Sequence, residues 1–278
     1  MISCLQFSNT GFTKKLGMTM KIISYSDLHL EFGTDFKPPT DSDADVMILA
    51  GDIITFRDYE PLTHFLEGWD KPVLFVAGNH EYYTNTVMGD ENKRFKEWLK
   101  TTHPNATFLQ DEAITIDNVH FFGGTMWTDF CNKSEKAMLQ AQAQMNDYRL
   151  IRKNEHERLT PMHTVEMHEV FVEKLNQWFS EDLPGARVVI THNAPVINPN
   201  TKYINSPLSP AFNSLDMIDV IKEYQPDLWV YGHTHECDDH YLGKTRMLSN
   251  QLGYPDRVGS FECAEFDKKG KSVEIRTL

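Results

Sequence analysis

Five short apolar runs constrain the fold of this chain more than any other feature. Each is rich in Val, Ile, Leu or Phe and is bounded by Gly, Asp or Asn; they are KIISYS (21–26), DVMILAG (45–51), PVLFVAG (72–78), RVVIT (187–191) and DLWVYG (227–232). Runs of this length and composition are typical of strands that are covered on both faces. Because such strands usually alternate with helices, the sequence predicts an α/β fold.

Helical patterns lie between these runs. Apolar and aromatic residues share one helical face in three segments, at Phe95, Trp98 and Leu99, at His168, Phe171, Leu175 and Trp178, and at Leu215, Ile218 and Ile221. These stripes indicate helices that pack on a sheet. A chain of 278 residues with 40% apolar content has an ordinary size for one large α/β domain. We therefore expect a single domain over residues 20–278.

Two segments fall outside this alternation. Residues 1–19 show no apolar periodicity, so we expect a flexible N-terminal leader there. Residues 133–160 are polar and helix-prone and follow the glycine-closed run HFFGGTMW (120–127). We expect this stretch to be a helical insertion that could cap one face of the domain.

The net charge limits the classes of partner. The chain has 27 Lys and Arg against 40 Asp and Glu, a formal net charge of −13. Most of its surface therefore repels phosphate polymers, and extended nucleic acid is an unfavourable partner.

The four cysteines of the chain show no CxxC spacing, which fits a reducing compartment. No apolar run has the length of a membrane span. We expect a cytoplasmic protein with no membrane partner.

A potential metal ligand follows every one of the five runs. The residues at these strand ends are Asp27, His29, Asp52, Asn79, His80, Glu81, His192, His233 and His235. The carboxyl ends of strands in an open α/β sheet line one crevice, so we expect these side chains to converge. Asp, Asn and imidazole suit Mn, Fe, Zn or similar divalent ions. The set is too large for one tetrahedral ion, which predicts two divalent metal ions with Asp52 as the bridging carboxylate.

The order DLH, GD, GNHE, a His after a strand, and GHTH resembles the calcineurin-like metallophosphoesterase superfamily over residues 21–236. The resemblance implies an αββα sandwich of two mixed sheets flanked by helices. It also implies one metal held by Asp27, His29, Asp52 and His235, and a second held by Asp52, Asn79, His192 and His233. His80 would stay off the metals as the general acid, oriented by Glu81, although an acid at that place could also be an ordinary helix N-terminal residue.

The departures from the superfamily pattern indicate which branch of the superfamily the chain resembles. Its Ser/Thr protein phosphatases look like GDxHG, GDxxDRG and RGNHE, whereas this chain has SDLHL, GDIITFRD and AGNHE, without the matching arginines. We therefore do not infer protein dephosphorylation. The chain is more similar to small bacterial-type phosphoesterases, where THHAP is frequent. Here the sequence is THNAP, so that Asn193 replaces the second histidine and the expected ligand His192 is kept.

The implied activity is hydrolysis of a small phosphate ester. A hydroxide that bridges the two metals would attack phosphorus, and His80 would protonate the leaving alkoxide. A phosphodiester substrate is slightly favoured over a phosphomonoester. Two alternatives stay open: a nuclease, against which the net charge counts, and a non-catalytic interaction scaffold, which would be expected to have lost ligands or the histidine of GNHE.

Substrate contacts are the least defined part of the sequence. The candidates are Trp127, Asn146, Arg149 and Tyr82, with Tyr83, Tyr148, Asn250 and Tyr254 as further candidates. An arginine could clamp a phosphate, and aromatic rings could stack on a base. Local packing and surface charge explain each of these residues equally well.

Overall fold

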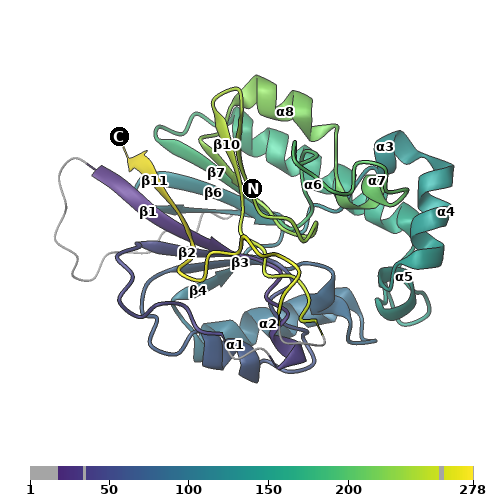
Figure 1. Cartoon of the computed structure of the whole chain (residues 1–278), viewed down its shortest axis with the longest axis horizontal. Coiled ribbons are helices and arrows are strands. Elements are labelled where there is room, and N and C mark those ends of the chain that lie inside the picture. Colours follow the sequence, from purple (N-terminus) through teal and green to yellow (C-terminus); the bar gives the residue numbers. More distant parts are fainter. Residues whose placement is uncertain (1–17, 34–35, 257–259, 278) are drawn as a thin grey trace.

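Two mixed β-sheets pack face to face between two layers of helices (Figure 1). The structure is a computed structural model, and it describes residues 18–33, 36–256 and 260–277. One sheet has the order β11-β1-β2-β3-β4; its strands are β1 (Met18–Tyr25), β2 (Val46–Ala50), β3 (Val73–Val76), β4 (Ala106–Phe108) and β11 (Lys271–Thr277). The other has the order β5-β6-β7-β8-β10-β9; its strands are β5 (Glu112–Ile116), β6 (Val119–Gly124), β7 (Ala186–Thr191), β8 (Leu228–Val230), β9 (Asp238–Leu242) and β10 (Thr245–Ser249). The predicted αββα sandwich is confirmed.

The five apolar runs form β1, β2, β3, β7 and β8. The first three are parallel neighbours in one sheet, and β7 and β8 are parallel neighbours in the other. Parallel pairing places the carboxyl ends of neighbouring strands at the same edge. This arrangement positions the polar residues that follow each run.

The alternation of side chains along the strands produces the layers of the core. In β2, Val46 and Ile48 lie in the cluster between the two sheets, together with Val188 and Ile190 of β7. Met47, from the opposite face of β2, lies in the cluster that packs under the helices. Because successive strand residues point to opposite faces, a run that is apolar at every position fits a sheet covered on both sides.

Helices cover the outer face of each sheet (Figure 1). The segments predicted to be helical form α2 (Met88–Thr102), α6 (Pro161–Ser180) and α8 (Met217–Tyr224). Leu215, predicted on the apolar face of the third helix, lies before α8 and is exposed. The short helix α1 (Glu60–Phe65) lies beside α2, where Thr63 contacts His103. Phe171, Leu175 and Trp178 of α6 pack on Phe122 of β6 in a third cluster. None of the described helices has both the length and the apolar character needed to cross a membrane.

The predicted insertion contains helices, and the first strand begins within the predicted leader. The stretch 133–160 contains α4 (Glu135–Gln144) and α5 (Asp147–Leu150), with α3 (Phe130–Lys133) before it. Of the predicted leader, residues 1–17 lie outside the described residues, whereas Met18 and Thr19 belong to β1. The strand starts earlier than predicted because these two residues pair with Thr277 and Arg276 of β11, a partner that the local pattern does not show.

Candidate metal centre

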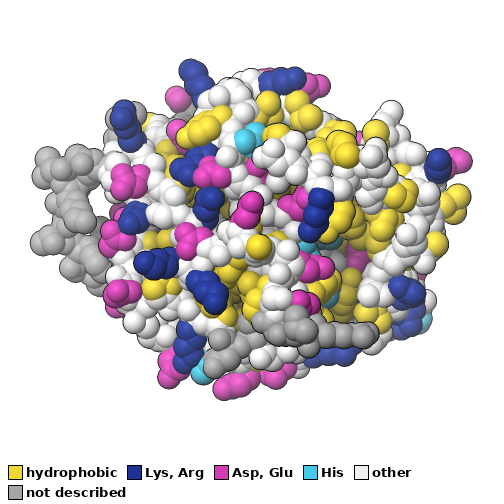
Figure 2. All heavy atoms as spheres, in the orientation of Figure 1, with side chains coloured by type: hydrophobic (Ala, Val, Ile, Leu, Met, Phe, Trp, Pro, Cys, Tyr) yellow, Lys and Arg dark blue, Asp and Glu magenta, His cyan; other side chains and the backbone are white. Residues whose placement is uncertain are grey.

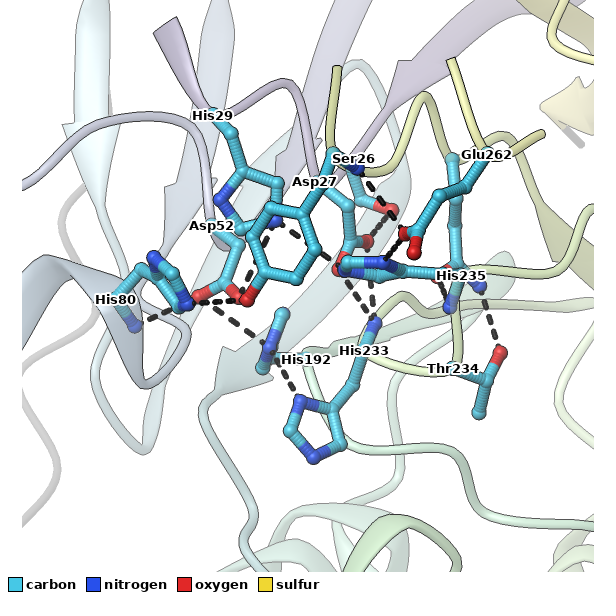
Figure 3. A network of polar contacts seen from close by, with 12 residues as sticks. Ser26, Asp27, His29, Asp52, His80, His192, His233, Thr234, His235 and Glu262 are labelled. Carbon is cyan, nitrogen blue, oxygen red and sulfur yellow. Dashed lines mark hydrogen bonds and ion pairs between the residues drawn. The ribbon is translucent and has the colours of Figure 1, made fainter. Parts of the chain in front are cut away.

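The seven side chains predicted to be metal ligands come together where five strands end. Figure 3 shows six of them, and the seventh, Asn79, contacts His192. The seven residues follow the ends of β1, β2, β3, β7 and β8, and they are Asp27, His29, Asp52, Asn79, His192, His233 and His235. The strand ends of both sheets meet at one edge of the sandwich, so residues separated by up to about two hundred positions face one another, as in the hydrogen bond from the His233 amide to Asp27.

Asp52 lies between two groups of donor atoms (Figure 3). Its Oδ1 atom is 3.4 Å from Nε2 of His192, and its Oδ2 atom is 3.9 Å from Nε2 of His29. The two carboxylate oxygens therefore point to different imidazoles. One carboxylate in this position faces both groups of donor atoms.

The donor atoms on each side of Asp52 converge closely. On one side, Nε2 of His235 lies 3.2 Å from Nε2 of His29 and 3.5 Å from Oδ1 of Asp27. On the other side, Nε2 of His192 lies 3.0 Å from Nδ1 of His233 and 3.1 Å from Oδ1 of Asn79. Each side offers nitrogen and oxygen donors within the space of one coordination shell, and the mixture suits Mn, Fe or Zn.

The backbone at the site adopts conformations that side chains usually avoid. Five of the seven expected ligands have positive φ angles, between 46° and 72°; they are Asp27, His29, Asp52, His233 and His235. A non-glycine residue in this region is uncommon, and such residues cluster at functional sites because the surrounding structure must maintain them. The fold therefore holds these turns in place to aim the side chains.

Two glycines make the close approach of the ligands possible. A Cβ atom on Gly78 would collide with Oδ1 of Asp52, and one on Gly51 would collide with the His192 ring and with the amide of Gly78. Gly51 also has a φ of +85°. Glycine is required at both turns because the backbone passes directly against the donor atoms.

The buried histidines and carboxylates shift one another's pKa values. Burial opposes ionisation of Asp52, yet nearby His192 and His80 hold its pKa well below the usual range. Burial lowers the pKa of His192, but the Asp52 carboxylate outweighs this effect and raises the pKa to about 9. The pKa of His235 is raised to about 10 against burial, because its ring bonds to Asp27 and Glu262. His233 shifts in the opposite direction, because burial and the neighbouring charge of His192 lower its pKa to about 3.

The Glu81 carboxylate binds backbone amides. It accepts hydrogen bonds from the amides of Asp52 at 2.9 Å, Ile53 at 2.8 Å and Gly78 at 2.7 Å, so it ties the turns after β2 and β3 together. Burial and the Asp52 charge raise the pKa of Glu81 to about 8. The described contacts of the Glu81 carboxylate are thus to the backbone of these turns. The carboxylate that contacts the His80 ring is that of Glu31.

Glu31 and Tyr254 hold the His80 ring. Nδ1 of His80 lies 3.0 Å from Oε1 of Glu31, and Nε2 lies 2.7 Å from the Tyr254 hydroxyl. His80 also lies near His29 and Asp52, and the donor atoms of these three residues are close enough together to hold a metal ion. The expectation that Glu81 orients this ring is therefore corrected to Glu31, because the turn that begins at His29 brings Glu31 back over the site.

Two further carboxylates form hydrogen bonds with side chains that are expected metal ligands. Asp147, at the start of α5, accepts hydrogen bonds from Nδ2 of Asn79 at 2.9 Å and from the Tyr83 hydroxyl at 2.5 Å. Glu262 bonds to Nδ1 of His235. Such partners fix the orientation of metal-ligating side chains. The sequence reasoning missed Glu31, Asp147 and Glu262; only Glu31, two residues after His29, carries a local signal.

The residues predicted to contact substrate fall into two groups. Asn146 lines a cavity of about 270 Å³ beside Asp52 and His233. Arg149 turns toward Asn146 and the Gln144 carbonyl, and Trp127 is buried in the hydrophobic cluster beneath the helices. Tyr82 is fully buried, and its hydroxyl donates to Asn92. The structure therefore brings only Asn146 of these four to the cavity wall, whereas Tyr83 and Tyr254 of the further candidates also line the cavity.

The comparison with known proteins identifies the family. Residues 20–237 match the model of the calcineurin-like phosphoesterases, so the chain belongs to this family. Together with the His and Asp clusters, membership supports a metal-dependent hydrolase of phosphoric esters.

Individual relatives are distant. An uncharacterized protein of Acanthamoeba polyphaga mimivirus is 28% identical over 87% of this chain and 94% of its own length. The phosphopantetheinyl hydrolase of Mycobacterium tuberculosis has a similar fold, with a TM-score of 0.66 at 17% identity over 86% of this chain and 91% of that one. A dimetal phosphatase from Danio rerio gives a TM-score of 0.51 at 10% identity, over 93% of this chain and 99% of that one. At these identities, the two structures show a shared fold.

Proposed function

We propose that this chain is a dinuclear metal-dependent phosphodiesterase that acts on a small substrate. The observation that carries the proposal is the placement of Asp52, whose two carboxylate oxygens face separate groups of nitrogen and oxygen donors. Asp27, His29 and His235 would hold one divalent ion, Asn79, His192 and His233 would hold the other, and Asp52 would serve both. Two such ions neutralise phosphoryl oxygens and lower the pKa of a water molecule, which supplies the nucleophile.

The protein's own residues would position the remaining chemistry. His80 would protonate the leaving oxygen, since it lies beside the centre while its ring is held by Glu31 and Tyr254 rather than by the ligand set. Proton donation by a positioned side chain typically contributes about 10² to 10⁴ in rate. Because Nε2 is bonded to the Tyr254 hydroxyl, either this hydroxyl passes the proton on or the Tyr254 side chain moves when substrate binds.

Metal analysis combined with hydrolysis tests this function. Protein loaded with Mn should contain two ions and should release p-nitrophenolate from bis(p-nitrophenyl) phosphate. Asp52→Asn should lose both ions, because the shared carboxylate is removed, whereas His29→Ala should keep the ion on the other side. Two tightly bound ions in Asp52→Asn would contradict the bridging role. Two bound ions in the native protein without hydrolysis of any phosphate ester would favour the scaffold alternative.

A further inference from the structure

The cavity beside the metal centre has an apolar and aromatic wall. This wall comes from the segment that leads into α7 (Ser209–Phe212) and includes Tyr203, Leu208 and Phe212. Met145, which follows α4, lines the same cavity from the insertion. Figure 2 shows hydrophobic side chains gathered over α7 and the neighbouring insertion, on the right of this view. A bound molecule would thus meet an apolar and aromatic surface on this side of the cavity, next to the reactive centre.

The wall reaches the expected metal ligands directly. The Phe212 ring of this wall lies 5.0 Å from the His233 ring, measured between ring centres. Tyr254, which also lines the cavity, has its ring 4.6 Å from the His235 ring. A phosphate bound at the centre would therefore have any second ester group within reach of this wall. The volume of about 270 Å³ is near the lower end for small-molecule pockets, which favours a compact group.

The cavity offers no lysine or arginine for a second anionic group in the part of the chain that the structure describes. Among the described residues that line it there is no Lys or Arg, while Asp52 and Asp147 are both present. Lys202 stacks on the Tyr203 ring, 4.8 Å from its centre, and lines the neighbouring cavity instead. Arg149 is turned toward Asn146. A carboxylate or further phosphate on the substrate would lie beside Asp52 and Asp147 here without a Lys or Arg to pair with, and burying an unpaired charge is costly.

On the basis of the proposed phosphoesterase function, we infer that the substrates are singly charged phosphodiesters whose second ester group is uncharged and aromatic or apolar. That group lies on the wall formed by Tyr203, Leu208 and Phe212. A phosphomonoester carries about two negative charges at neutral pH, and it has no second group to place on the wall. The same wall excludes substrates with an anionic second group, such as a chain of several phosphates.

Four esters that share the p-nitrophenolate leaving group test this inference. They are phenyl p-nitrophenyl phosphate, methyl p-nitrophenyl phosphate, 4-carboxyphenyl p-nitrophenyl phosphate and p-nitrophenyl phosphate. We expect kcat/KM for the phenyl ester to exceed that for the methyl ester by roughly 10- to 100-fold, from burial of the ring. The carboxyphenyl ester, which has nearly the same shape plus a charge, should fall at least about tenfold below the phenyl ester.

A pair of tyrosine variants locates the effect. Tyr203→Ala removes part of the wall and should reduce the phenyl-to-methyl ratio several-fold. Tyr241→Ala is the matched control, because Tyr241 lies on β9 with 64% of its surface exposed and does not line the cavity. Tyr241→Ala should leave the ratio unchanged. An equal reduction of the phenyl-to-methyl ratio in both variants would show that the wall does not cause the preference, and it would overturn the inference.

Binding provides a readout that does not depend on turnover. Calorimetry of the metal-loaded protein should show tighter binding of diphenyl phosphate than of dimethyl phosphate. Equal affinities, a phenyl-to-methyl ratio near one, or a preference for the monoester or carboxyphenyl ester would overturn the inference and leave the phosphoesterase function in place. If none of the four esters is hydrolysed although two ions are bound, the proposed function is wrong. The calorimetric comparison then still decides whether the wall prefers aromatic diesters.

Discussion

Replacing Glu31 separates the proposed acid from the metal ligands. Glu31 is the carboxylate at Nδ1 of His80, at 3.0 Å, and its contact with the expected ligand His29 is longer, at 3.4 Å. A hydrogen bond to a charged partner contributes about 1.5–3 kcal/mol, and a neutral one about 0.5–1.5 kcal/mol. Glu31→Gln keeps the shape and an acceptor oxygen, so it should lose about 1–1.5 kcal/mol of the interaction that holds the ring. That corresponds to a fall in kcat of roughly 5- to 13-fold.

The assay compares a poor leaving group with a good one. Dibenzyl phosphate releases an alkoxide that needs a proton, whereas bis(p-nitrophenyl) phosphate releases an ion that departs without one. Glu31→Gln should slow the dibenzyl ester by the predicted factor and the p-nitrophenyl ester much less, with metal content and KM nearly unchanged. Glu31→Ala should produce the same pattern with a larger fall, of roughly 10- to 150-fold, because the whole charged interaction is lost.

Glu262→Gln is the matched control. Glu262 also bonds to Nδ1 of a histidine, but that histidine is His235, an expected metal ligand. This variant should weaken metal binding and slow both esters by the same factor. If Glu31→Gln behaves like Glu262→Gln, with lost metal and no dependence on the leaving group, then Glu31 supports a metal ligand and the reasoning about His80 is refuted.

Three other predictions follow from the site. Gly78→Ala should abolish metal binding while leaving most of the secondary structure intact, because a Cβ atom there collides with Asp52; circular dichroism and metal analysis check this, and full metal content would contradict it. Asp147→Ala should weaken one of the two metal sites about 10- to 100-fold, since Asn79 loses its partner, and a metal titration showing two unchanged affinities would contradict this. The metal-free protein should bind metal more tightly as the pH rises toward about 10, because the His235 imidazolium must lose its proton before the ring can bind a metal ion. Calorimetry in buffers of different ionisation enthalpy should detect this proton release, and a metal affinity that does not change between pH 7 and pH 9 would contradict the prediction.

The expected ligands could be identified from the sequence because each follows a buried strand. A short run of Val, Ile and Leu is recognisable locally, and the residue after it lies at the end of a strand wherever that strand sits. His233 and His235 follow β8, and Asp52 follows β2. Parallel pairing then brings such ends to one edge of a sheet, so local pattern and general topology together were enough to predict their convergence. Metal binding by these residues and proton donation by His80 stay predictions that the experiments above test.

Only the tertiary structure decided which side chains form hydrogen bonds with the residues of the site. His80 is bonded to Glu31, 49 residues away, and Asn79 is bonded to Asp147, 68 residues away in the insertion. No local pattern in α5 marks Asp147, and Tyr254 reaches His80 across 174 residues. Likewise, β1 starts at Met18 only because β11 pairs with it. A strand end is set by neighbouring residues, whereas a contact between distant segments depends on the path of every loop between them, and the path is known only when the whole chain is folded.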